Sequence, residues 1–133
     1  MPELSDAKVA DAVAQEAELL EDFHLVKFDP ETLTQAVKKA SSKYDGAYLP
    51  SEVEVLLDLA AAKRRLDHRE TDQTTLDLET EMRETFRAYH SLLNWGKFEK
   101  SANQLAHFNV LKIARLKIGA LPVVWPEDLG NAT

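Results

Sequence analysis

Apolar residues recur every three or four positions through most of this chain, in stretches bounded by helix start and stop signals. The spacing is that of an amphipathic α-helix. The 133 residues include only 4 Gly and 5 Pro, too few for a turn-rich β fold. We therefore predict an all-α fold with about five helices. The first series of apolar positions is Val9, Val13, Ala17 and Leu20.

The expected helices follow from these signals. We predict helices over residues 5–22 and 30–39, a third from 51 into the charged run 63–70, and a fourth over 76–94. Ser51 and Glu54 form a capping box, and Gly96 is a left-handed stop. Val55 and Leu59 lie off the main stripe of the third helix, which predicts its burial on more than one side. A possible cap at Ser101 precedes a last helical stretch to residue 118, either continuous or bent near 108.

Charge divides the chain unevenly. Residues 1–31 hold nine Asp and Glu against two Lys, so their net charge of −7 equals that of the whole chain. Residues 41–50 have turn chemistry, with Asp45-Gly46 and then Pro50. We therefore predict an acidic helical arm and connector over 1–50 and a compact helical domain over 51–133.

The sequence offers no constellation for catalysis. The absence of cysteine excludes thiol chemistry and Cys-ligated metals. The four glycines are far apart, so there is no phosphate-binding loop. Glu21-x-x-His24 is a single copy of a motif that a di-iron bundle needs twice, and His24 is expected to be a boundary or surface residue. We predict a non-enzymatic protein without metal or cofactor.

Binding to a partner is the remaining class of function. The aromatic residues Phe86, Tyr89, Trp95 and Phe98 form either a core seam or a partner-binding patch. The basic excess over residues 94–118 indicates either a solvated surface or a face for a partner or nucleic-acid backbone. No apolar run reaches the ~20 residues of a membrane span, and we expect an intracellular, soluble protein. The candidate partner-binding residues are Trp95, Lys97, Phe98, Leu4, Val9 and Val13.

The stretch 51–128 resembles the fourth subunit of RNA polymerase II, the helical half of the polymerase stalk, which has a counterpart in the archaeal RNA polymerase. That family's domain opens with Ser-Glu-Val and a leucine pair, followed by a charged helix end and a polar loop, here 63–75. A threonine and several aromatic residues follow, then a histidine–aromatic pair and a Pro-Glu element. The corresponding positions are Ser51-Glu52-Val53, Leu56-Leu57, Thr85, Tyr89, Trp95, Lys97, Phe98, His107-Phe108, Ala114, Leu116, Leu121 and Pro126-Glu127.

The resemblance implies a non-catalytic, nuclear protein with a fold like the C-terminal domain of helicases and RNaseD. It implies a heterodimer with the OB-fold stalk subunit, attachment to the RNA polymerase core, a role in transcription initiation, and at most weak, indirect RNA contact. The alternative is a small helical adaptor of another assembly, such as an organellar complex, that docks through its acidic amphipathic arm.

Overall fold

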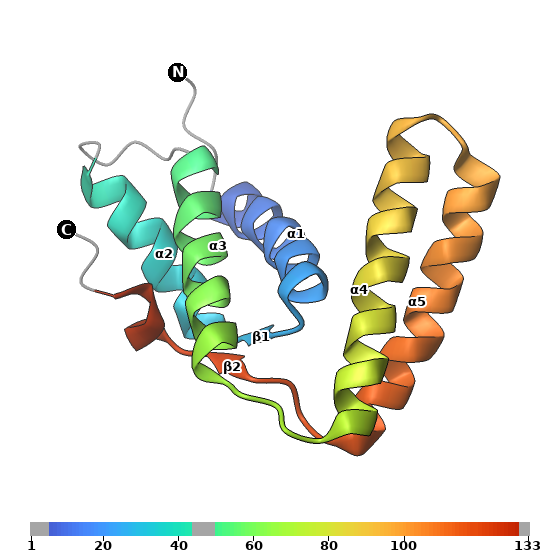
Figure 1. Cartoon of the computed structure of the whole chain (residues 1–133). Helices are drawn as coiled ribbons and strands as arrows, with labels where there is room; N and C mark the ends of the chain where they lie inside the picture. The colour runs from blue at the N-terminus through green and yellow to red at the C-terminus, as the bar shows by residue number, and fades with distance from the viewer. Residues whose placement is uncertain (1–5, 44–49, 131–133) are drawn as a thin grey trace. The chain divides into compact units, whose positions relative to one another are not determined.

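The computed structural model describes residues 6–43 and 50–130 of the chain, and its architecture is all-α (Figure 1). Five α-helices account for most of the described residues, which confirms the predicted fold class. In chain order the elements are α1 (Asp6–His24), β1 (Lys27–Phe28), α2 (Pro30–Lys43), α3 (Pro50–Asp67), α4 (Gln73–Asn94), α5 (Phe98–Ile118), β2 (Val123–Val124) and the 3-10 helix η1 (Pro126–Leu129).

The chain forms two compact units. Unit 1 contains α1, β1, α2, α3, β2 and η1, and unit 2 is the hairpin of α4 and α5. The chain leaves unit 1 after His68 and returns to it at Pro122. This division differs from the predicted boundary at residue 50, because α3 packs against α1, α2 and η1. The helices α1 and α2 are thus part of a packed unit and do not form a separate arm.

A short parallel strand pair joins the two ends of unit 1. Lys27 pairs with Val123 and Phe28 with Val124. The Asp29 N–H donates to the Val124 carbonyl at 3.0 Å, and the Thr32 hydroxyl donates to the same oxygen at 2.8 Å. Local periodicity did not predict this pairing, because all of α2, α3 and the hairpin lie between its strands.

The core of unit 1 is small and aliphatic. Leu57 and Ala61 of α3 are fully buried, as is Val26 at the entry to β1. Leu25, which directly follows α1, has a positive φ of 56° and is 1 % exposed. A left-handed backbone is unusual for leucine, so burial of its side chain holds this turn. The other buried hydrophobic residues of this cluster are Val13, Ala17, Leu20, Phe28, Ala36, Ala40, Val53, Ala60, Val124 and Leu129.

Unit 2 is an antiparallel helical hairpin, and aromatic and methionine side chains fill the contact between its two helices. Met82 and Phe108 are fully buried, and the Phe86 and Phe108 rings meet with their centroids 5.1 Å apart. Asp72 caps α4: its carboxylate accepts from the Thr75 N–H at 2.9 Å. Hydrogen bonding to Thr75 lowers the pKa of Asp72. The cap lies four residues before residue 76, where the sequence predicts the start of this helix.

The other helix boundaries were predicted in part. α3 begins at Pro50, one residue before the expected cap. α5 is one continuous helix that begins at Phe98, so Ser101 is inside it, and the predicted cap there was wrong. The Ser101 hydroxyl instead donates to the Phe98 carbonyl at 2.8 Å. Gly96 has a φ of 74° and ends α4 as predicted.

Ionisable side chains face one another between α1 and α3. The His24 imidazole lies 2.6 Å from the Asp58 carboxylate. Burial raises the pKa of Glu16, and the charge and side-chain hydrogen bond of Glu54 raise it further. A raised carboxyl pKa means that the folded state disfavours the ionised form. This contribution to stability is present below the ordinary value of 4.5 and is lost as pH rises through the folded-state pKa.

We therefore expect the Glu16→Gln variant to lose less stability than the natural chain between about pH 4 and about pH 7. The amide stays neutral and can still donate a hydrogen bond to Glu54. The measurement is urea unfolding at both pH values, with Glu18→Gln, at an exposed position of the same helix, as the matched control. Equal pH dependence in the Glu16→Gln variant and the natural chain would contradict the interpretation.

Candidate protein-docking surfaces

The free end of the α4–α5 hairpin is a tight turn built by backbone hydrogen bonds. The Gly96 N–H donates to the Leu93 carbonyl at 3.0 Å, and the Lys97 N–H donates to the Leu92 carbonyl at 2.9 Å. The positive φ of Gly96 permits this closure, because a residue without Cβ adopts the left-handed conformation at no steric cost. The turn places Trp95 at the end of α4 and Phe98 at the start of α5.

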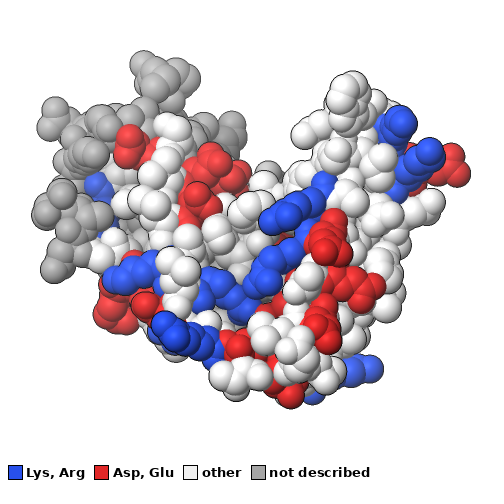
Figure 2. Space-filling model, in the orientation of Figure 1, with Lys and Arg blue, Asp and Glu red and all other residues white. Residues whose placement is uncertain are grey.

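Both aromatic residues of this turn are exposed. Trp95 is 79 % and Phe98 is 68 % exposed, and the end of the hairpin shows an uncharged surface with charged side chains beside it (Figure 2). The aromatic cluster therefore splits: Phe86 is in the hairpin core, Tyr89 is half-buried, and the other two are at the tip. The core-seam interpretation was wrong for Trp95 and Phe98. Exposed apolar groups of this size are typical of binding sites.

The remaining predicted partner-binding residues have other positions. Lys97 is exposed in the same turn. Val13 is 3 % exposed and packs in the core of unit 1, so its side chain is not part of a surface. Leu4 and the side chain of Val9 lie outside the described residues. The structure thus brings Trp95, Lys97 and Phe98 together.

A second exposed apolar surface follows one face of α3. Val55, Leu59 and Leu66 are 51 %, 63 % and 79 % exposed. Their spacing of four and seven residues places them on one side of the helix, and we call them the α3 stripe. The prediction that α3 is buried on more than one side was wrong within this chain, because the buried residues Val53, Leu57, Ala60 and Ala61 lie on the opposite side. Exposure could not be foreseen, since apolar periodicity alone predicts burial.

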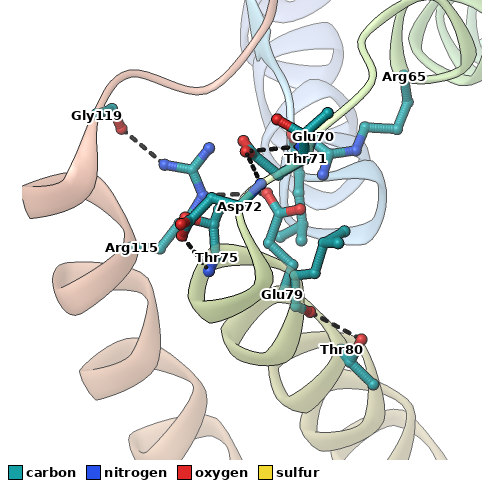
Figure 3. A network of polar contacts seen from close by, with 11 residues as sticks. Arg65, Glu70, Thr71, Asp72, Thr75, Glu79, Thr80, Arg115 and Gly119 are labelled. Atoms are coloured by element: carbon teal, nitrogen blue, oxygen red, sulfur yellow. Dashed lines mark hydrogen bonds and ion pairs between the residues drawn. The ribbon is translucent and has the colours of Figure 1, made fainter.

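The buried charges belong to the scaffold. At the base of the hairpin, Arg115 Nε donates to Glu79 Oε2 at 3.0 Å and Nη1 donates to the Gly119 carbonyl at 2.9 Å (Figure 3). Glu79 is fully buried and Arg115 is 3 % exposed. The pair neutralises two charges inside unit 2 and joins α4 to the end of α5. Because both side chains are buried, we interpret the pair as structural.

The single Glu-x-x-His motif is used for structure. Glu21 Oε2 accepts from the Phe28 N–H at 2.8 Å, whereas His24 contacts Asp58. Within residues 6–43 and 50–130, no group of three or more His, Cys, Asp or Glu side chains is arranged to hold a metal ion. No helix in the described part of the chain is long and apolar enough to cross a membrane.

Comparison with known families identifies the family. The model of a family described as an AAA lid domain matches residues 6–108 of the 133. The chain belongs to the AAA lid domain family. Searches of curated proteins and of solved structures found no match. The AAA lid domain match begins with α1 and ends within α5, so it includes the α3 stripe and the hairpin tip.

Proposed function

We propose that this AAA lid domain is a non-catalytic module that docks on an ATPase module through the α3 stripe. The proposal rests on the family match together with the exposed apolar face of α3. The chain has no glycine-rich phosphate loop, so nucleotide hydrolysis would belong to a separate ATPase module, in a further segment or another chain. We expect a lid domain to pack on the domain that it covers.

The chemistry of the stripe suits an interface between domains. Leu66 is 79 % exposed and Leu59 63 %, and two leucines of this exposure on one face are costly to leave in water, at about 25 cal/mol per Å² of apolar surface. Lys63 is exposed beside the stripe and adds a charge at its edge. The hairpin tip with Trp95 and Phe98 is then a separate docking surface, available to a second protein.

The RNA polymerase stalk hypothesis is retained as an alternative proposal. It is supported by the resemblance over 51–128 and by the exposure of Trp95 and Phe98 at positions where the stalk family carries aromatic residues. In this alternative the chain would be nuclear and would pair with the OB-fold stalk subunit. An adaptor role in another assembly would have to use the outer faces of α1 and α2, because Val13 and Leu20 face inward.

Co-purification distinguishes these proposals. The tagged full chain is isolated from its source cells, and bound proteins are identified by mass. We expect recovery of a protein with a phosphate-binding loop, and we expect Leu59→Glu to reduce that recovery at least tenfold. A charge placed within an apolar interface costs several kcal/mol. Arg87→Glu, at an exposed position of α4 outside the stripe, is the matched control for an added negative charge and should retain most of the binding.

Other recoveries would contradict the proposal. Large polymerase subunits together with an OB-fold protein would favour the stalk alternative. An ATPase that binds the natural chain and the Leu59→Glu variant equally would leave the family assignment intact and move the docking surface away from α3.

A further inference from the structure

The outer face of α5 carries a third, separate pattern. Four apolar residues on this face are exposed to solvent and lie opposite the side that packs on α4. Val110 is 64 % and Ile113 is 58 % exposed, and both alanines of the pattern are exposed as well. We call the following residues, spaced by three or four positions, the α5 stripe: Glu99, Ala102, Ala106, Val110, Ile113 and Lys117.

The order of side chains along the α5 stripe is asymmetric in size and in charge. The half toward the hairpin tip has a carboxylate and two small residues. The half toward the base has two large aliphatic residues and an ammonium group. Position 108 is at the centre of the pattern, and Phe108 itself faces inward. Each member of one half has a counterpart of opposite size or charge at nearly the same distance on the other side of that centre.

This arrangement is complementary to itself when two α5 helices run antiparallel. Glu99 of one copy then lies opposite Lys117 of the other. The alanines 102 and 106 lie opposite Ile113 and Val110, respectively. Small residues facing large ones allow two helices to interdigitate, at an interaxial distance of roughly 8–10 Å. A parallel pair would place like charges together, Ile113 against Ile113 and alanine against alanine.

We propose that the α5 stripe is a self-association surface on which a second copy of this chain docks in antiparallel orientation. The contact is isologous, so every interaction occurs twice around the two-fold axis. In each hairpin, α4 covers one side of α5. Pairing through the other side would bring four helices together, an arrangement in which helices bury their apolar faces. The inference is independent of the proposed docking of α3 on an ATPase module and uses none of the same residues.

The first test is the association state of the full chain. Sedimentation equilibrium over a concentration series at low ionic strength should show a monomer–dimer equilibrium. Ile113→Glu should abolish the dimer, because it puts a carboxylate at each of two symmetric apolar contacts. Lys117→Glu should weaken dimerisation about tenfold, and the double reversal Glu99→Lys/Lys117→Glu should restore it. Glu84→Lys, at an exposed position of α4, is the control for a change of charge elsewhere on the hairpin.

The second test reports the relative orientation of the two α5 helices. Because the chain has no native cysteine, only the introduced cysteines can form a disulfide. Ala102→Cys and Ile113→Cys variants are mixed and oxidised under mild conditions. The antiparallel pair places these positions opposite each other, so a disulfide-linked heterodimer should form. Ala102→Cys alone should not cross-link, because its two copies would be about 18 Å apart along the helix axis.

Three results would overturn the inference. A chain that remains monomeric at the highest concentration measured has no such surface for a copy of itself. Efficient cross-linking of Ala102→Cys with itself would indicate a parallel pair. A dimer that withstands Ile113→Glu would form through another face. Circular dichroism of each variant establishes that it is folded, so loss of dimerisation is separable from loss of the hairpin.

Discussion

Replacing Arg115 by methionine is expected to destabilise the α4–α5 hairpin by about 3–5 kcal/mol. The guanidinium is within 3.0 Å of the Glu79 carboxylate, and both side chains are buried in unit 2. Removing the cation takes away a charge partner of Glu79 in a low-dielectric site, so less of the cost of desolvating the carboxylate is offset. The hydrogen bond to the Gly119 carbonyl is lost as well. Urea unfolding followed by circular dichroism measures the change.

The double variant Glu79→Met/Arg115→Met separates the charge effect from simple loss of contacts. Two methionines fill a similar volume without a buried charge, and such replacements are often neutral or stabilising. We expect the double variant to recover most of the stability lost by the single one. Arg87→Met, at an exposed position of α4, should change the free energy of unfolding by less than about 0.5 kcal/mol. A double variant as unstable as Arg115→Met would contradict the explanation.

Replacing Phe108 by alanine is the second large effect, with an expected loss of about 3–5 kcal/mol. Phe108 is fully buried and its ring packs on Phe86. Truncation removes the central contact of a seam only two helices wide, so few neighbours can move in to fill the space. Chemical denaturation at a fixed pH measures the loss.

The same helix supplies the control for this substitution. Phe98→Ala removes an identical side chain from a position that is 68 % exposed, and its expected cost is below about 0.5 kcal/mol. Equal destabilisation by the two substitutions would show that the tip, contrary to its exposure, is packed. A stable Phe108→Ala variant would place the core of the hairpin elsewhere.

The sequence predicted helix and non-helix far better than it predicted packing. Gly96 could be assigned as a helix stop because the left-handed backbone conformation that follows many helices favours glycine. Asp72 was missed as a cap because it lies in a polar run, where a cap and a loop residue have the same composition. The β1–β2 pairing was missed because its two strands have two residues each and are joined only in three dimensions.

The candidate surfaces show the same limit. Trp95 and Phe98 could be recognised as core or partner-binding residues, but only the position of the hairpin turn decides that they are exposed. Val55 and Leu59 deviate from the main stripe of α3, and this deviation was the available signal for a second contact face. Its interpretation as burial within the chain failed because none of the other described elements of unit 1 covers that side. A face that a partner covers and a face that the chain covers have the same apolar pattern.

We propose above that the α3 stripe packs on an ATPase module. The most direct measurement of this packing is chemical cross-linking of the native, co-purified complex with a lysine-reactive reagent, followed by identification of the linked peptides. We expect cross-links between Lys63 on α3 and a protein that carries a phosphate-binding loop. Cross-links from Lys97 and Lys100 at the hairpin tip to such a protein, without any from Lys63, would contradict it.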